Sequence, residues 1–408
     1  MHGAQSSVER ALGVVARREH EVRAWAFIDA ESARASAAQV DAAPAGPLSG
    51  AVLGVKDLFD TAGQPTEYGS PIFAGRVPPT DAVAVAALKA AGAVLLGKTV
   101  TAELGGYHPG PTTNPLDPTR TPGGSSMGSA AAVAAGMADI ALGAQTAASV
   151  IRPASFCGVY GFKPTFGVVP TGGLRVMAPS LDTVGWFARD AATVGLVTAC
   201  LIGGGASPAP ARAAEGPPTF GVLRTGHWEE ASPESRRAVE GLADAVRRAG
   251  ADVVDLEMPQ SWGSLDRVHT TVMEYEGARS LAAEYQLHRD LLSAGLRTMI
   301  ERGSAIGSGS YGDALDTVER ARRSIDAAFG GAQVVLTPAV LGEAPVGLAS
   351  TGDPRFGRLW SLLGLPVLCV PAGVGAAGMP IGVQIVGRAG ADDAVAAAGA
   401  WIEAARRA

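Results

Sequence analysis

The sequence predicts an α/β protein: a single large domain with a mixed, largely parallel twisted central sheet covered by helices on both faces. Short apolar runs typical of strands alternate with helical patterns along most of the chain. Hydrophobic residues make up 47% of the 408 residues and charged residues only 18%, which is enough apolar material for a deep core. The 54 glycines and 27 prolines are spread along the chain and therefore indicate turns and close packing.

The first part of the chain predicts a helix, a strand, a helix and a second strand. Ser6 and Glu9 have the spacing of a capping box at the start of the first helix. The apolar run at 51–55 predicts a strand that leads into Lys56. Residues 81–92 have helical spacing, and 93–98 predict the next strand.

The later part of the chain continues this alternation. The predicted elements are a strand at 218–223, a helix at 234–250, strands at 251–258, 332–338, 365–371 and 381–387, and a closing helix at 392–407. Residues 265–329 have no strand pattern, so we expect them to form a helical cover over one face of the sheet. The closing strands and helix would then occupy about 332–407.

A linker divides the predicted elements without dividing the protein. The segment at 203–218 is rich in glycine, alanine and proline and is the best linker candidate. Strand-like runs that suit one sheet occur on both sides of it. We therefore expect a single domain over 1–408, with its core at about 50–190.

Composition and charge exclude several classes of protein. The net charge is −6 and the 33 basic residues form no long run, so nucleic-acid binding has no electrostatic basis. The six histidines have no metal-ligand spacing, and no apolar run has the layout of a signal peptide or a membrane span. The widely spaced Cys157, Cys200 and Cys369 indicate reduced thiols. We expect a cytoplasmic protein with no metal, nucleic-acid or membrane partner.

Lysine is rare in this chain, which has only Lys56, Lys89, Lys98 and Lys163. Arginine cannot lose its proton, whereas a desolvated lysine can act as a neutral base near pH 7. Lys56 follows a predicted strand and is a candidate for such a base, the alternative being an ordinary lysine that extends to solvent. We expect Lys89 to face solvent and the other two to be structural hydrogen-bond donors.

Two serine-containing segments at 121–165 also suggest chemistry. Ser125 and Ser126 follow two glycines, and Ser149 lies in a turn of small residues. A serine nucleophile needs a base and convergent backbone N–H donors, and unencumbered peptide lets such donors converge. A surface loop is the alternative, because Gly-Gly-Ser-Ser is also a common linker composition.

Several separated motifs resemble those of the amidase signature enzymes. The motifs are GVKDLFDTAGQPTEYGS, GKT, NPLDPTRTPGGSSMGSAAAVAAG, ALGAQTAASVIRPASFCGVYGFKPT, LASTGDPRFGRLWSLLGLPVLCVPAG and GMPIGVQIVGR. The resemblance spans about residues 50–390. It implies the amidase signature fold, a Ser–Ser–Lys catalytic triad and no cofactor.

The resemblance gives each residue of the triad a role. Lys56 corresponds to the base, Ser125 to a bridging serine held by a cis peptide after Gly124, and Ser149 to the nucleophile; Ser126 is not catalytic in this alignment. The implied reaction is hydrolysis of a small C–N amide to a carboxylate and ammonia or an amine, through a seryl acyl-enzyme. A small-molecule amide is then the substrate, and a homodimer is left open.

The resemblance also implies an oxyanion site made by the backbone N–H groups of Thr146, Ala147, Ala148 and Ser149. Many members of the family have Gly-Gly before the nucleophile, where this chain has Ala147-Ala148. If the turn requires a positive φ at Ala148, its Cβ costs about 1 kcal/mol or more and tilts a donor. We would then expect a slower reaction.

Arg152 and Met273 are the candidate substrate contacts. Arg152 lies three residues after Ser149, an arrangement similar to malonamidase and related hydrolases of carboxylate-bearing amides. It is a candidate clamp for a substrate carboxylate, the alternative being a structural arginine bonded to nearby carbonyls. Met273 falls where malonamidase-type enzymes have Gln, which favours a more apolar acyl pocket.

Two other functions suit the same motifs. One is hydrolysis of a carbamoyl compound, such as allophanate or a biuret derivative, by the same triad. The other is a non-hydrolytic subunit of the amidotransferase type. The retention of Lys56, Ser125 and Ser149 argues against a scaffold without activity.

Overall fold

The computed structural model describes residues 3–203 and 217–407. Their strands form one eleven-stranded sheet in the order β1-β3-β2-β4-β6-β5-β10-β11-β9-β7-β8. The strands are β1 Trp25–Ile28, β2 Val52–Lys56, β3 Val94–Thr99, β4 Ile140–Gln145, β5 Tyr160–Lys163, β6 Thr183–Ala188, β7 Phe220–Leu223, β8 Val253–Leu256, β9 Val334–Pro338, β10 Val367–Val374 and β11 Pro380–Gly387.

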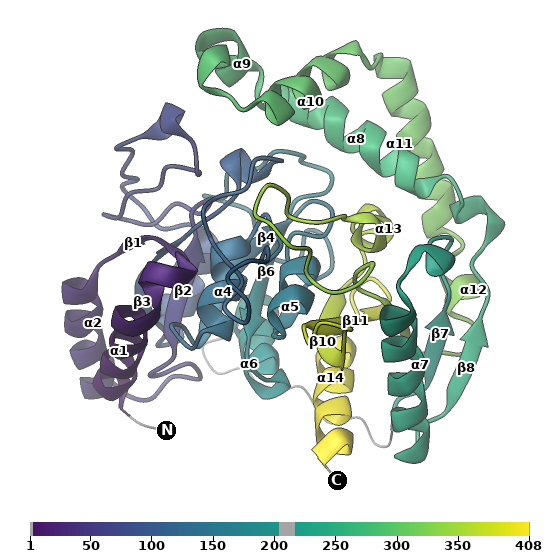
Figure 1. Ribbon diagram of the computed structural model, residues 1–408, viewed down its shortest axis with the longest axis horizontal. Helices are drawn as coiled ribbons and strands as arrows, with labels where there is room; N and C mark the ends of the chain where they lie inside the picture. The colour runs from purple at the N-terminus through teal and green to yellow at the C-terminus, as the bar shows by residue number, and fades with distance from the viewer. Residues whose placement is uncertain (1–2, 204–216, 408) are drawn as a thin grey trace.

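Helices surround this sheet (Figure 1). They are α1 Ala4–Val22, α2 Ala30–Ala42, α3 Val83–Ala90, α4 Met127–Ala134, α5 Ile151–Cys157, α6 Ala191–Ile202, α7 Pro233–Arg248, α8 Leu265–Ser280, α9 Ala282–His288, α10 Ala294–Ala305, α11 Ser308–Arg322, α12 Ile325–Phe329, α13 Arg355–Leu363 and α14 Asp392–Arg407. The α/β fold with one mixed sheet is confirmed.

The strand directions divide the sheet into zones. The parallel pairs are β2 with β3 and β4, and β7 with β8 and β9. Every neighbouring pair from β4 to β9 across the middle of the sheet is antiparallel, and so is β1 with β3. The parallel share is therefore smaller than expected. One reason is that β10 and β11 follow each other closely in the chain, and a short connection joins only antiparallel strands.

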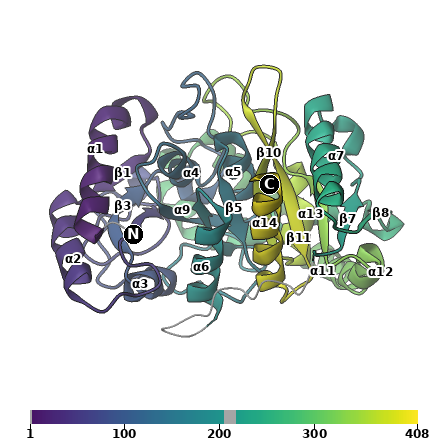
Figure 2. The same cartoon turned by 90° about the horizontal axis from the view of Figure 1, so that it is seen from below.

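Helices cover both faces of the sheet, as the side chains of β10 show. Leu368 faces α14, because a Cβ on Gly399 of that helix would lie 2.3 Å from its Cδ2. The next side chain, Cys369, faces α5: the Cβ position of Gly382 is 2.5 Å from its Sγ and 3.1 Å from Ser155 Cβ. Consecutive strand residues point to opposite faces. In Figure 2, α5 and α14 accordingly lie on opposite sides of the sheet.

The helical segment at 265–329 exists as predicted but occupies a different place. Helices α8, α10 and α11 form a layer above one end of the strands, away from the chain termini (Figure 1). The contacts of α8 are mainly with α10, α11 and α13. The expectation of a cover over one sheet face was wrong, because α8 packs on other helices and on the turn after β4.

Two expectations for the chain's local structure also need comment. The first helix begins at Ala4, so Ser6 lies inside it and the predicted capping box is wrong. Asp41 of α2 instead accepts hydrogen bonds from the backbone N–H groups of Ala4 (2.6 Å) and Gln5 (3.1 Å). The predicted linker at 203–218 lies almost entirely outside the described residues.

Within the described ranges, no helix has the length and apolar character needed to cross a membrane. The same residues contain no group of three or more histidine, cysteine, aspartate or glutamate side chains placed to hold a metal ion.

Candidate active site

The candidate site lies where two neighbouring parallel strands end. Lys56 is the last residue of β2 and Gln145 the last residue of β4. Parallel strands end at the same edge of a sheet, so the segments that follow them meet there. Ser125 lies just before α4, and Ser149 just before α5. The fold thus brings together residues that are far apart in the sequence.

Lys56 makes direct contact with both serines of the Gly-Gly-Ser-Ser segment. Its Nζ lies 2.8 Å from Ser125 Oγ and 3.0 Å from Ser126 Oγ. The backbone carbonyl of Ala144 is a third partner, at 3.4 Å. Lys56 is fully buried, and Ser126 Oγ in turn donates to the same carbonyl at 3.3 Å. The side chain of Lys56 is therefore held by two hydroxyls and a carbonyl, without a carboxylate.

Burial lowers the pKa of Lys56 to about 7, although the negative charge of Asp182 acts in the opposite direction. Desolvation disfavours the ammonium form because no charged partner replaces its water. At neutral pH a substantial fraction of Lys56 is therefore the neutral amine. This form has a lone pair that can accept a proton.

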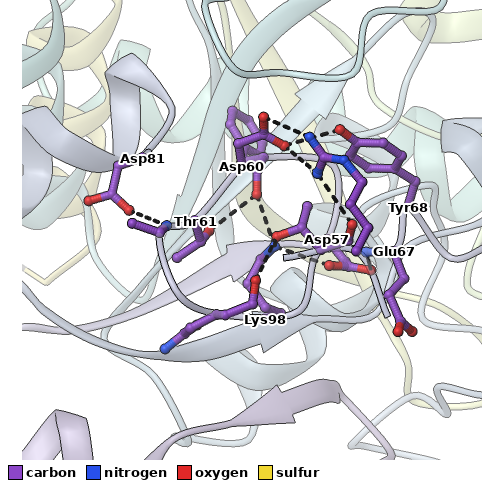
Figure 3. A network of polar contacts seen from close by, with 12 residues as sticks. Asp57, Asp60, Thr61, Glu67, Tyr68, Asp81 and Lys98 are labelled. Carbon is purple, nitrogen blue, oxygen red and sulfur yellow. Dashed lines mark hydrogen bonds and ion pairs between the residues drawn. The ribbon is translucent and has the colours of Figure 1, made fainter. Parts of the chain in front are cut away.

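The neighbouring Asp57 does not pair with Lys56, because its carboxylate is directed to another buried lysine. Asp57 Oδ1 lies 3.1 Å from Lys98 Nζ, which also donates to Thr66 Oγ1 at 2.5 Å. Figure 3 shows this network, which continues through Asp60 and Tyr68. Lys98 thus fulfils the structural role expected for it, and the network leaves Lys56 without a counter-ion.

A lowered pKa alone does not identify the base. Burial also lowers the pKa of Lys163 to about 7. Its Nζ, however, donates to the carbonyl of Pro164 at 2.6 Å and to no serine in the described part of the chain. Lys56 differs because it contacts two hydroxyls.

The peptide between Gly124 and Ser125 is cis, as the resemblance implied. Both of its carbonyl neighbours are held by hydrogen bonds. Arg152 Nη2 donates to the carbonyl of Gly124 at 2.6 Å, and the backbone N–H of Ala102 donates to that of Ser125 at 3.1 Å. These contacts fix the direction of the Ser125 side chain toward Lys56.

The turn at 146–149 is held from inside by Gln145. Its Oε1 accepts from the backbone N–H groups of Val150 (2.8 Å) and Ile151 (3.1 Å). In the described residues, no protein acceptor lies within hydrogen-bond distance of the N–H groups of Ala147, Ala148 or Ser149. Three consecutive donors are therefore available to a ligand.

The two alanines of this turn do not cause the expected strain. The described non-glycine residues with positive φ are Arg23, Tyr68 and Leu104, so Ala147 and Ala148 have ordinary negative φ values. A Cβ at these positions has no conformational cost of the kind that motivated the expectation of a slower reaction. The turn instead relies on small neighbours, since a Cβ on Gly357 would lie 2.6 Å from the carbonyl oxygen of Ala147.

Several distant residues complete the support of this turn, and sequence reasoning missed them. Thr146 Oγ1 donates to Asp182 at 2.5 Å, and Ser361 Oγ donates to the carbonyl of Ala147 at 2.8 Å. His269 Nε2 lies 3.0 Å from the carbonyl of Thr146. Burial lowers the pKa of His269 to about 4, so this side chain is neutral and its Nε2–H is the donor. No local motif marks these residues.

Ser149 is positioned beside the other two residues of the predicted triad. Its backbone carbonyl accepts a hydrogen bond from the N–H of Ser126 at 3.4 Å. Its side-chain oxygen has no hydrogen-bond partner among the described residues, and the residue is 9% exposed. The structure therefore joins Lys56 directly to Ser125, and places Ser149 next to them with a free, slightly accessible hydroxyl.

Arg152 is almost fully committed to protein carbonyls. Besides Gly124, its terminal nitrogens bond the carbonyl of Gly352 at 2.7 Å and Thr351 Oγ1 at 2.8 Å. The residue is only 5% exposed. These contacts favour the structural alternative for Arg152, in which it ties the cis peptide to the segment before α13.

Met273 lies on the face of α8 that is directed to the site. It is buried and follows His269 by four residues, which places both on one side of the helix. Four residues further on, Gly277 packs against Met177 and Met299. Met273 thus belongs to an apolar surface next to the turn at 146–149, and its contact with substrate stays a prediction.

Replacing Gln145 by Leu should lower kcat by about 10- to 100-fold with little change in KM, because misplacing an oxyanion donor costs about as much as weakening it. Val150 and Ile151 would lose their acceptor, and the turn would no longer be fixed. Steady-state kinetics would measure the effect. Gln384→Leu is the control: that buried glutamine bonds the carbonyls of Pro338 and Phe356, so its loss should reduce stability without the same loss of kcat. Equal losses of kcat in both variants would contradict the role of Gln145.

Sequence comparison places this site in a known family. A family model described as Amidase matches residues 6–396. One relative is the A-type chain of the glutamyl-tRNA(Gln) amidotransferase of Anaeromyxobacter dehalogenans (strain 2CP-C). It is 35% identical to this chain, and the match covers 93% of this chain and 88% of that protein. The chain belongs to the amidase signature family.

Solved structures agree with this assignment. A crystal structure of an amidase matches with a TM-score of 0.89 and 32% identity, covering 98% of this chain and 96% of the other. The 6-aminohexanoate cyclic dimer hydrolase, in complex with its substrate, matches with a TM-score of 0.87 and 26% identity over 98% and 93% of the two chains. These relatives share a fold but carry different activities.

Proposed function

We propose that the protein is an amidohydrolase that cleaves a small C–N amide to a carboxylate and ammonia or an amine. The observation that carries the proposal is the fully buried Lys56, whose amine contacts the hydroxyl of Ser125 and has no carboxylate partner. A structural lysine needs neither a lowered pKa nor a row of hydroxyls. A general base near neutral pH needs both.

The contacts of Lys56 support a direction for proton transfer. A neutral amine has two N–H donors and one lone pair. The carbonyl of Ala144 can only accept, and Ser126 Oγ donates to that carbonyl, so both are suited to receive the N–H groups of Lys56. The lone pair is then left for the O–H of Ser125, which makes Ser125 the proton donor to Lys56.

The reaction proceeds from this arrangement through an acyl-enzyme. Lys56 takes a proton from Ser125, which takes the proton of Ser149 as Ser149 Oγ attacks the amide carbonyl. The N–H groups of the turn at 146–149 bind the oxyanion, each donor contributing about 3–4 kcal/mol. The proton returns through Ser125 to the leaving nitrogen, and water then releases the carboxylate by the same relay. No step calls for a cofactor.

An ammonia-release screen of the purified protein tests this function. We expect release from short primary amides without any added partner protein, at a rate that is lost in Ser149→Ala. Aliphatic, aromatic and carboxylate-bearing amides should be included, together with allophanate and biuret. Preferential turnover of the last two would identify the carbamoyl hydrolase alternative.

The amidotransferase alternative has one observation in its favour, which is the similarity to a chain of an amidotransferase. It predicts that the purified chain releases no ammonia from any amide until a partner protein is added. Full activity of the chain alone would contradict it. A homodimer stays a prediction that light scattering would test.

The proposed place of action is the cytoplasm. Cys157, Cys200 and Cys369 are all free thiols, which suits a reducing compartment.

A further inference from the structure

We propose that Arg358 of α13 binds a carboxylate group of the substrate and gives the enzyme its preference for acid-bearing amides. This inference rests on the proposed function and names its substrate class. It assigns to Arg358 the role that the sequence suggested for Arg152. The positions, the free donors and the surroundings of the two arginines all distinguish them.

The two arginines differ in the donors they keep. Both terminal nitrogens of Arg152 already donate to protein oxygens. Arg358 donates from Nη1 to Asp266 Oδ2 at 2.9 Å, and its Nη2 has no acceptor in the described part of the chain. The side chain of Arg358 is 22% exposed. Arg358 therefore keeps an accessible charged donor for a ligand, and Arg152 does not.

Arg358 projects from a helix that lies directly against the oxyanion turn. Its neighbour Gly357 is so close that a Cβ there would lie 2.7 Å from the Cβ of Ala148. One turn further along α13, Ser361 donates to the carbonyl of Ala147. The start of the Arg358 side chain is thus fixed within a residue of the turn that carries the proposed oxyanion donors.

The partner of Arg358 brings its guanidinium to the same side. Asp266 lies in the first turn of α8, three residues before His269. His269 in turn contacts the carbonyl of Thr146. Residues three apart on a helix are neighbours on one face, so the guanidinium of Arg358 lies between α13 and the part of α8 that contacts the turn.

The charge of Arg358 reaches several side chains of the site. Burial lowers the pKa of His269 to about 4 and that of Arg152 to about 10, and the positive charge of Arg358 adds to both effects. Burial raises the pKa of Tyr107, and Arg358 opposes that change. These three side chains come from α8, α5 and the segment before Ser125, so Arg358 lies where those elements converge.

Asp266 does not exhaust the charge of Arg358. The Asp266 side chain is 37% exposed, and ion pairs with this exposure contribute little to stability. A substrate carboxylate can therefore share the guanidinium at small cost. Arg355, three residues earlier, is different: it pairs with both Glu230 and Asp353 and has no free terminal nitrogen. It provides a matched control.

The test compares two amides of equal length, succinamate and the neutral butyramide. In Arg358→Gln, KM for succinamate should rise by about 10- to 200-fold, the range for loss of a charged hydrogen bond. Both kinetic constants for butyramide should change by less than about twofold. Arg358→Lys should keep part of the preference, and Arg355→Gln should leave the ratio of the two substrates unchanged.

Two results would overturn the inference. One is an equal loss for both substrates in Arg358→Gln, which would make Arg358 a structural residue. The other is a wild-type enzyme that turns over butyramide as well as succinamate, which would leave the proposed amidase function intact. Succinate provides an independent readout: it should slow phosphonyl fluoride labelling of Ser149 in the wild type and not in Arg358→Gln. This readout applies even if no amide is hydrolysed.

Discussion

Ser149→Ala should eliminate formation of the acyl-enzyme and reduce turnover by a factor on the order of 10³ or more, as expected for removal of a nucleophile. Ser149 Oγ has no hydrogen-bond partner in the described residues, so its removal leaves no buried group unsatisfied. We therefore expect the free energy of unfolding to stay within about 0.5 kcal/mol of the wild-type value. Chemical denaturation and single-turnover kinetics would measure the two effects separately.

Covalent labelling identifies the nucleophile without a known substrate. A phosphonyl fluoride should attach to Ser149, as located by mass spectrometry of peptides. Ser126→Ala is a suitable comparison because Ser126 also contacts Lys56 but has no part in bond formation, so this variant should still be labelled at Ser149. A label found on Ser125 or Ser126 of the wild type would refute the assignment of Ser149.

The parts of the site that the sequence could predict are those written in local motifs. The strand before Lys56 and the two serine segments follow from apolar runs and small residues. The contact between Lys56 and Ser125 then followed only from the family resemblance, because 69 residues separate them in the chain. The structure adds the reason why Lys56 has no counter-ion, which is that Asp57 turns to Lys98.

The residues that sequence reasoning missed reach the site from remote elements. Asp182, His269 and Arg358 lie on three different segments, and each is an ordinary polar residue in its own neighbourhood. The strand β4 was also missed, since its residues, IALGAQ, include too few branched or aromatic side chains to stand out. At the N-terminus, a distant carboxylate performs the capping that a local pair was expected to perform. Tertiary contacts decided all of these cases.

The pH dependence of activity should report the proton held by Lys56. Because the amine must be neutral to accept a proton and burial lowers its pKa to about 7, kcat/KM should rise with pH through about 7 and reach a plateau above it. Lys56→Ala should lose several orders of magnitude, and Lys56→Arg should not restore activity because guanidinium stays charged. Lys163→Met is the matched control: Lys163 is a buried lysine whose pKa is also lowered to about 7, and its loss should leave the profile unchanged.

Asp182 gives this prediction a sign that can be checked. Its negative charge raises the pKa of Lys56 against the larger effect of burial. Asp182→Asn removes that charge, so the pKa of Lys56 should fall further and the acid limb of the kcat/KM profile should move to lower pH. The height of the plateau should also decrease, because Asp182 holds the hydroxyl of Thr146 in the oxyanion turn. A limb that stays in place in Asp182→Asn, or appreciable turnover by Lys56→Arg, would mean that a group other than Lys56 takes the proton.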